Sequence, residues 1–166
     1  MKIFIMRHGD AVATAKGETD AERRLSREGE LEVATNANWL AEQLAGDALS
    51  LALVSPYTRA QQTATIVHSL VKSNVQETCK DITPDSSAEQ FLDYLTARLA
   101  LAAEQKHEIA SVLIVSHMPF VSYLVSEFDP RIQPPIFPTA GIAEIDYDVD
   151  SAKGKLANLI IADRCV

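Results

Sequence analysis

The sequence predicts an α/β fold: a three-layer sandwich with a mostly parallel central sheet flanked by helices, plus a C-terminal hairpin. Three observations predict it. Short, continuous apolar runs, typical of strands buried on both faces, recur at residues 3–6, 49–54 and 112–115. Segments with apolar residues at helical spacing follow these runs, and alternating strands and helices are the pattern of an α/β sheet. Near the end, residues 142–147 alternate and residues 156–161 pair back after a turn.

Four segments are predicted to be helices because their apolar residues repeat at helical spacing. In chain order these residues are Val33, Ala37, Leu40 and Leu44, with Trp39 alongside; Ala60, Ala64, Val67 and Val71; Phe91, Leu95, Leu99 and Ala102; and Val121, Leu124, Val125 and Phe128. Ser86 and Ser87 stand three residues before Glu89 and Gln90, a capping-box pattern for the third helix. Pro119 suits the first turn of the fourth helix.

The connections between these elements are predicted to be short or irregular. Residues 73–111 are expected to hold little beyond a loop and one helix, and three prolines between residues 134 and 138 indicate an irregular connection. The chain contains no internal repeat, low-complexity segment or linker. We therefore expect a single domain over residues 1–166.

Composition excludes several classes of function. The chain has 166 residues, 47% of them hydrophobic and 23% charged, as in an ordinary globular protein. Its formal net charge of −8 argues against nucleic acid and anionic membrane surfaces, which bind basic proteins. No run approaches the ~20 apolar residues of a membrane-spanning helix. The apolar start of the chain is too short for a signal peptide.

The two cysteines indicate no cofactor. Cys79 and Cys165 are far apart and resemble neither a metal-binding nor a redox motif. We expect them to be reduced, in a cytoplasmic protein. No metal-ligand cluster is apparent, so we expect no metal and no cofactor.

The sequence also bears on the oligomeric state. No heptad or long apolar patch is evident, which favours a monomer.

Polar residues capable of phosphate chemistry follow three of the predicted strands. Arg7-His8-Gly9 follows the first, Ser55 to Arg59 follow the second, and His117 follows the third. Ligands of such sheets bind beyond the carboxyl ends of the strands, so these residues should converge. A histidine can attack phosphorus, an arginine can neutralise phosphate charge, and a glycine lets the backbone approach closely. Each group alone could equally be a solvated loop or a structural histidine.

Arg59 gives a second indication of an anion. It lies in the first turn of the second predicted helix, where the helix dipole disfavours a cation. An anion bound there, beside free backbone N–H groups, would account for it. We expect Ser55 or Thr58 to cap this helix. The alternative is an arginine exposed on the helix surface.

Together these motifs resemble the histidine phosphatase (phosphoglycerate-mutase-like) superfamily, and within it the small SixA-type phosphohistidine phosphatases. The resemblance spans nearly the whole chain. It rests on Arg7-His8-Gly9-Asp10-Ala11, Ala37-Asn38-Trp39-Leu40, Ser55-Pro56 with Arg59-Ala60 and Thr63-Ala64, Ser111-Val112-Leu113, Ser116-His117-Met118-Pro119, Tyr123-Leu124-Val125 and Pro134-Pro135.

The resemblance implies a role for each matching residue. His8 would be the nucleophile and become transiently phosphorylated, with its other ring nitrogen donating to a backbone carbonyl. Arg7 and Arg59 would grip the phosphoryl oxygens, and His117 would be a further donor. Arg23 would also bind phosphate, because Arg23-Arg24-Leu25-Ser26 resembles the family's Arg-x-Leu-(Ser/Thr) stretch; Arg24 would be a neighbour without function. The reaction would need no metal.

The chain departs from the larger family members, which carry an inserted segment that caps the site and supplies an acidic proton donor. Residues 73–111 leave little room for it, and their acids Asp81, Asp85 and Glu89 suit turn or helix-start roles. Asp10 is a possible acid, although it could equally be a local cap. A site without a cap should be open and suit a phosphorylated side chain of another protein.

Three functional hypotheses follow. The leading one is a metal-independent phosphatase of protein phosphohistidine, acting on a phosphotransfer domain or phosphocarrier. The alternatives are a phosphatase of small phosphate esters, such as sugar or nucleotide phosphates, and a non-catalytic phosphate-binding module.

Outside the motifs, His68 and His107 are expected on the surface. Several acids are expected to be solvated: Glu18, Asp20, Glu22, Glu28, Glu30 and Glu32.

Overall fold

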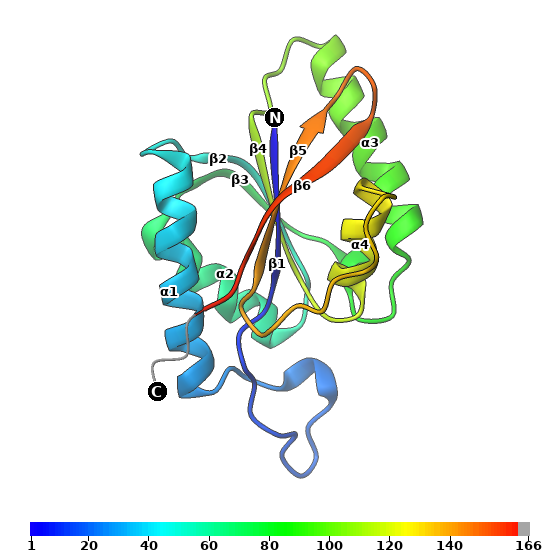
Figure 1. The fold of residues 1–166 in the computed structure, drawn as a ribbon. Helices are drawn as coiled ribbons and strands as arrows, with labels where there is room; N and C mark the ends of the chain where they lie inside the picture. The colour runs from blue at the N-terminus through cyan, green and yellow to red at the C-terminus, as the bar shows by residue number, and fades with distance from the viewer. Residues whose placement is uncertain (163–166) are drawn as a thin grey trace.

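A computed structural model describes residues 1–162 of the chain, and in this part of the molecule six strands form one sheet (Figure 1). The strands are β1 (Lys2–Arg7), β2 (Leu49–Val54), β3 (Ser73–Thr78), β4 (Ser111–Ser116), β5 (Ile142–Asp148) and β6 (Lys153–Ile160), in the order β3-β2-β4-β1-β5-β6. The neighbours from β3 to β1 pair in parallel, whereas β5 and β6 pair antiparallel. The predicted α/β class is confirmed. The sheet is mixed rather than mostly parallel, because the C-terminal hairpin joins it alongside β1.

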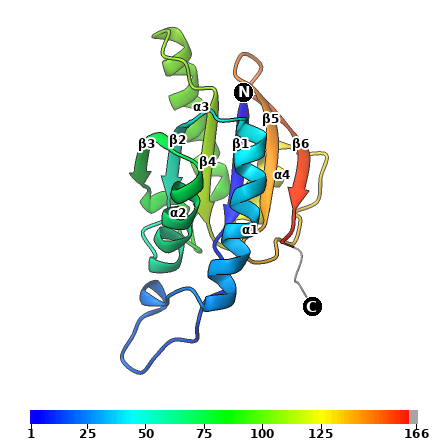
Figure 2. The same ribbon diagram turned by 90° about the vertical axis from the view of Figure 1, so that its left-hand side faces the viewer.

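Helices cover both faces of the sheet (Figures 1 and 2). On one face lie α1 (Arg27–Leu44) and α2 (Thr58–Leu70), and on the other lie α3 (Ala88–Glu104) and α4 (Phe120–Phe128). Two short 3₁₀ turns, η1 (Asp20–Glu22) and η2 (Lys80–Ile82), lie in the connections.

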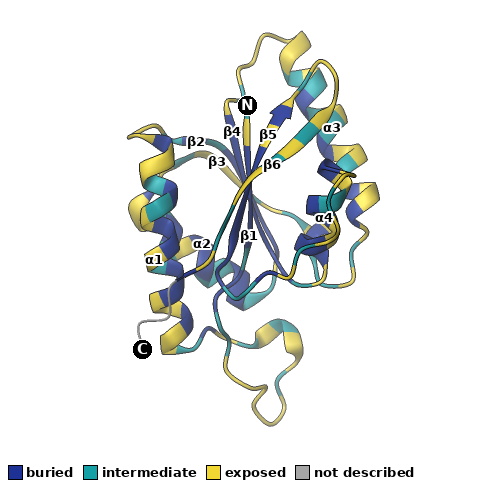
Figure 3. Ribbon diagram, viewed as in Figure 1, coloured by how far each residue is buried: buried dark blue, intermediate teal, exposed yellow. Residues whose placement is uncertain are grey.

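The core consists of two apolar clusters, one on each face of the sheet. Successive side chains of β1 alternate between them, because strand side chains point to opposite faces. Phe4 and Met6 pack with residues of α1 and α2, and Ile3 and Ile5 pack with residues of α3 and α4. Figure 3 shows the buried sides of the helices turned toward the strands. Burial on both faces explains why the central strands read as continuous apolar runs.

Strand register brings the carboxyl ends of β1, β2 and β4 to one edge. Arg7 is paired with Ser116 and Val54 with Val115, so the chain leaves all three strands at the same level. The backbone N–H of His8 donates to the carbonyl of Ser116 at 3.0 Å, which extends this alignment beyond the strands. The predicted site residues therefore begin from adjacent points.

Three local predictions have clear outcomes. Residues 73–78 form β3 rather than a loop; most of this edge strand is exposed, so it has no continuous apolar run. Ser87 caps α3, because its hydroxyl accepts from the Gln90 N–H, as the capping box predicted. The predicted cap of α2 is wrong: Tyr57 is the N-cap residue, and its side chain makes no capping hydrogen bond. In the described part of the chain, no helix is long and apolar enough to cross a membrane.

Candidate active site

The residues that follow β1, β2 and β4 meet at the carboxyl edge of the sheet. His8 and His117 lie with ring centroids 5.1 Å apart, and the Arg59 side chain from the first turn of α2 reaches His8. His8, Ser55, Arg59 and His117 are all buried. The convergence predicted from the strand ends is therefore present.

The hydrogen bonds of His8 leave one ring nitrogen as a base. Nδ1 lies 2.7 Å from the Gly9 carbonyl, which can only accept, so Nδ1 carries the proton. Nε2 therefore carries the lone pair, which accepts a hydrogen bond from Nε of Arg59 at 3.1 Å. Burial, with the charges of Arg59 and Arg7, lowers the pKa of His8 from 6.5 to about 4. A neutral imidazole with its lone pair on Nε2 is the form that can attack phosphorus.

The bonds of His117 permit the complementary tautomer, in which Nδ1 is a hydrogen-bond donor without a partner among residues 1–162. Its Nε2 lies 2.7 Å from Oγ of Ser55, and that oxygen also accepts from the Tyr57 N–H. The Ser55 hydroxyl can donate to Nε2 of His117 while it accepts from this amide, and in that tautomer the histidine carries its own proton on Nδ1. Burial, with the charge of His8 and the arginines, lowers the pKa of His117 to about 2, so the ring is neutral.

Two buried nitrogen atoms at this edge have no partner within residues 1–162. They are Nδ1 of His117 and Nε of Arg7. Buried polar groups are nearly always hydrogen-bonded, so these two nitrogens offer hydrogen-bonding capacity to solvent or to a bound ligand. Nη1 of Arg7 is anchored to the carbonyl of Phe137 at 2.7 Å, which holds the guanidinium in place. The arrangement fits an oxyanion.

Arg59 is held from three sides. Besides its bond to His8, Nη1 donates to the backbone carbonyl of Asp20 at 2.7 Å and Nη2 to Oδ2 of Asp20 at 3.1 Å. The Tyr57 ring lies 5.1 Å from Cζ of Arg59, within the range of a cation–π contact. This buried cation thus touches both Nε2 of His8 and the carboxylate of Asp20.

Asp20 is the site residue that the sequence prediction missed. Its carboxylate joins Arg59 to Arg23, whose Nε donates to Oδ1 at 2.9 Å. Partial burial opposes ionisation, but the hydrogen bonds and charges of the two arginines lower the pKa of Asp20. Its side chain is 57% exposed, so the expectation of a solvated acid is confirmed, but the pairing with two arginines was not predicted. No local pattern indicates the role, because Asp20 reaches Arg59 only when the loop between β1 and α1 folds back.

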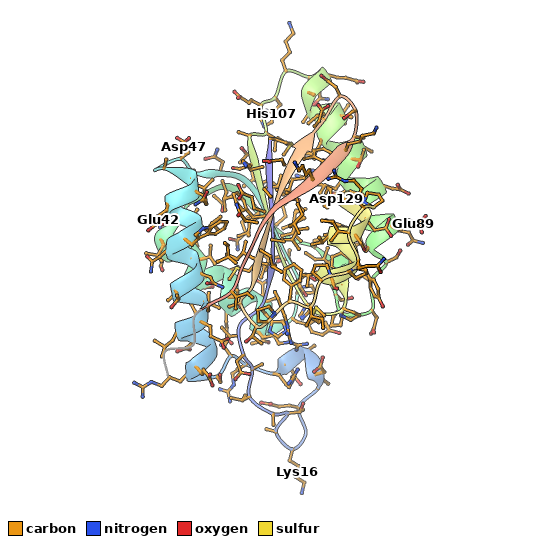
Figure 4. The ribbon with its side chains drawn as sticks, in the orientation of Figure 1. Lys16, Glu42, Asp47, Glu89, His107 and Asp129 are labelled. Atoms are coloured by element: carbon orange, nitrogen blue, oxygen red, sulfur yellow. The ribbon has the colours of Figure 1, made fainter. Side chains whose placement is uncertain are left out.

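The same loop distinguishes Arg23 from Arg24. Arg23 is half-buried and lies close enough for its charge to lower the pKa of His8, whereas Arg24 is exposed and offers only its backbone carbonyl, to Val12. In Figure 4, Lys16 marks the tip of this loop, far beyond the sheet. This placement favours Arg23 as the arginine that could reach a bound phosphate.

Asp10, the possible acid, has its carboxylate engaged. Oδ2 accepts from the hydroxyl of Ser26, the N-cap residue of α1, at 2.6 Å. Its backbone N–H donates to Oε2 of Glu32, which also accepts from the Thr139 hydroxyl. Glu32 is buried, so the expectation that it is solvated is wrong. Its position next to Val33, on the buried face of α1, could have indicated this burial from the sequence. Proton donation by Asp10 stays a prediction.

The remaining candidates lie away from this cluster. His107 is exposed, as expected, and His68 is half-buried on α2 rather than on the surface. Cys79 is a half-buried free cysteine, and Cys165 lies outside the described residues. Among residues 1–162, no group of three or more His, Cys, Asp or Glu side chains could hold a metal ion.

Comparison with known proteins defines the class to which this fold and site belong. Residues 3–82 match the family model of the histidine phosphatase superfamily (branch 1), and this range contains His8, Arg23 and Arg59. The chain belongs to the histidine phosphatase superfamily.

More similar relatives place it within that class. The chain is 37% identical over 149 residues to the phosphohistidine phosphatase SixA of Escherichia coli K12, covering 89% of this chain and 86% of that protein. It is 36% identical to the SixA homolog of Haemophilus influenzae, with 89% of each chain covered. The structure of the protein histidine phosphatase SixA complexed with tungstate superposes with a TM-score of 0.85 at 36% identity, covering 98% of this chain and 97% of that one. The chain is thus a member of the SixA phosphohistidine phosphatase family.

Proposed function

We propose that this protein is a metal-independent phosphatase that removes the phosphoryl group from phosphohistidine in another protein, with His8 as the nucleophile. The observation that carries the proposal is the lone pair on Nε2 of neutral His8 beside two buried nitrogens without partners among residues 1–162, Nδ1 of His117 and Nε of Arg7. Family membership supports the reaction. The roles of the individual residues rest on this geometry.

Substrate binding uses the fixed cations. The phosphoryl oxygens accept hydrogen bonds from Arg7, Arg59 and His117, and Arg23 adds a fourth donor from the β1–α1 loop. Arginine forks suit the geometry of phosphate. These groups stabilise the charge of the transferring phosphoryl group, which is the main task in phosphoryl transfer.

The reaction proceeds in two balanced steps. Nε2 of His8 attacks phosphorus while the bond from phosphorus to the substrate imidazole breaks, and that imidazole leaves with a proton supplied by solvent. Water then attacks the phosphorus on His8, which releases inorganic phosphate and restores neutral His8. Because a protonated imidazole leaves readily, the reaction demands less of an enzyme acid than ester hydrolysis does.

A protein substrate agrees with the surroundings of the site. Residues 71–110, where larger family members carry a capping insert, form β3, η2 and α3 at the side of the sheet. A phosphotransfer domain or phosphocarrier could therefore present its phosphohistidine directly. We propose such a partner for a cytoplasmic, monomeric enzyme.

The test is detection of the covalent intermediate. Enzyme mixed with a ³²P-labelled phosphohistidine protein and quenched in alkali should carry an acid-labile, alkali-stable phosphoryl group on His8. In His8→Ala the adduct should disappear, and turnover should fall by about a thousandfold or more. The control His107→Ala, an exposed histidine outside the site, should behave as wild type, and chelator should have no effect. Full activity of His8→Ala, or loss of activity in chelator, would contradict the proposal.

A further inference from the structure

Three of the segments that border the phosphate pocket lack charged side chains. They are residues 55–58 after β2, residues 118–119 after β4, and residues 132–138 in the connection between α4 and β5. Exposed loops normally carry charges, and 23% of this chain is charged. Pro56, Pro119 and Pro134 are nevertheless exposed here, and Tyr57 and Met118 are half-buried. These three segments, which adjoin the candidate site, are therefore uncharged and mainly apolar.

Ile136 is the most exposed part of this border, with 85% of its surface accessible. A single exposed aliphatic residue is common, but this one is held in place from both sides. The carbonyl of Pro135 accepts from the Ser122 hydroxyl of α4, and the carbonyl of the buried Phe137 accepts from Arg7 in the pocket. Prolines at 134, 135 and 138 restrict the backbone further. Ile136 is thus a rigid apolar projection next to a phosphate-binding arginine.

The length of a phosphohistidine side chain determines which part of a substrate lies over these segments. A phosphohistidine side chain is short, so the partner's backbone and neighbouring residues must lie over the pocket mouth when its phosphoryl group reaches His8. Apolar, pre-ordered side chains gain free energy from such contact without desolvating charges or losing much conformational entropy. A free phosphorylated metabolite has no such surface to offer.

We propose that the apolar rim, defined as Pro56, Tyr57, Met118, Pro134 and Ile136, is the docking surface for the phosphorylated protein, with Ile136 as its main anchor. This inference rests on the proposed function and specifies the partner further. The partner is a folded protein with an apolar patch next to its phosphohistidine. The rim provides affinity for the protein, while the pocket provides recognition of the phosphoryl group.

The experiment compares two substrates with the same leaving group. One is free N-phosphohistidine, and the other is a histidine phosphotransfer domain phosphorylated with phosphoramidate. In Ile136→Ser, kcat/KM for the domain should fall by about tenfold or more, mainly through KM, because one buried aliphatic side chain is lost from the interface. For free phosphohistidine it should stay within about twofold of wild type. Ile136→Met should restore most of the activity on the domain.

The matched control is Leu101→Ser. Leu101 is also an exposed aliphatic residue, 53% accessible, but it lies in the last turn of α3, near the start of β4 and hence at the opposite end of the sheet. This variant should turn over both substrates like wild type.

The outcomes separate the two proposals. Unchanged activity of Ile136→Ser on the domain would overturn the docking inference, as would equal losses on both substrates, which would make Ile136 a support for Arg7. A wild-type dimer abolished by Ile136→Ser would also overturn it, by assigning the rim to a second copy. Wild-type enzyme inactive on both substrates would contradict the proposed function itself.

Discussion

At the residue scale, Asp20 stands out because it is an anion inside a site built for an anion. Its carboxylate occupies Nη2 of Arg59 and Nε of Arg23, and its backbone carbonyl occupies Nη1 of Arg59. These are donors that a phosphoryl group would use. Bound phosphate must therefore share them with Asp20 or displace it, and the negative charge of Asp20 opposes phosphate in either case.

We predict that Asp20→Asn binds inorganic phosphate about three- to tenfold more tightly, because the amide carries no charge to compete for the arginines. The effect should shrink in high salt, since the Asp20 side chain is largely exposed. Competitive inhibition of aryl phosphate hydrolysis measures it. Glu18→Gln is the control, because Glu18 lies in the same loop and bonds only the backbone N–H of Ala15. Weaker phosphate binding in Asp20→Asn would show that Asp20 positions Arg59 rather than competing with substrate.

His8 gives a prediction about pH. Its pKa falls from 6.5 to about 4 on folding, chiefly by burial. Between these values the unfolded chain protonates His8 and the folded protein does not, so the unfolded state binds more protons and acid favours unfolding. The His8 contribution to the free energy of unfolding is complete above pH 6.5 and is lost as pH falls toward about 4, by up to about 3 kcal/mol.

Urea unfolding between pH 4.5 and 6.5 checks this sign. The free energy of unfolding of wild type should decrease more steeply with acid than that of His8→Gln, which has no group to titrate at this position. An NMR titration of the His8 ring should show a midpoint near pH 4 in the folded protein. Parallel slopes in the two proteins would contradict the assignment of a neutral His8.

At the element scale, the approach of α1 to the end of β1 holds the nucleophile segment in place. Gly29 lies in the first turn of α1, and a Cβ added to it would stand 2.1 Å from the carbonyl oxygen of Asp10. A Cβ added to Gly9 would meet the backbone of Gly29 at 2.6 Å. The helix and the segment that follows His8 therefore touch backbone to backbone, which only glycine permits at both positions.

We predict that Gly29→Ala lowers the free energy of unfolding by about 2–4 kcal/mol, even though alanine is favoured over glycine within helices by about 1 kcal/mol. The clash involves backbone, which cannot move aside as a flexible side chain can. Phosphatase activity should fall as well, because the shift displaces His8. Urea denaturation and turnover measure both effects, and Glu30→Ala, an exposed change in the same helix turn, should be nearly neutral. A Gly29→Ala protein as stable as wild type would refute the close packing.

At the scale of the whole molecule, one sheet organises both the core and the site. The two apolar clusters share the central strands, and the carboxyl ends of those strands present Arg7, His8 and His117 together. A single domain over residues 1–166 stays a prediction, supported by this shared sheet. The chain as a whole is acidic, with a net charge of −8. The arginines at the candidate site are therefore a local group of positive charges in an acidic protein.

Much of this organisation could be predicted from the sequence because its causes are local. Strands β1, β2 and β4 are buried on both faces, which produces continuous apolar runs, and polar residues directly after such runs must lie at the sheet edge. The four helices were predicted from apolar spacing. The strand β3 was not, because an exposed edge strand needs no apolar run. Family resemblance, rather than spacing, led to Arg23.

The sequence by itself determined the α/β class, the strand ends that carry Arg7, His8, Arg59 and His117, and the family. Only the tertiary structure decided which nitrogen of His8 carries the proton, that Asp20 joins two arginines, that Glu32 is buried, and that the exposed Ile136 precedes the residue whose carbonyl holds Arg7. The physical reason is that periodicity records burial along one element. Hydrogen bonds and ion pairs between distant segments depend on how the elements are brought together, and no local pattern encodes them.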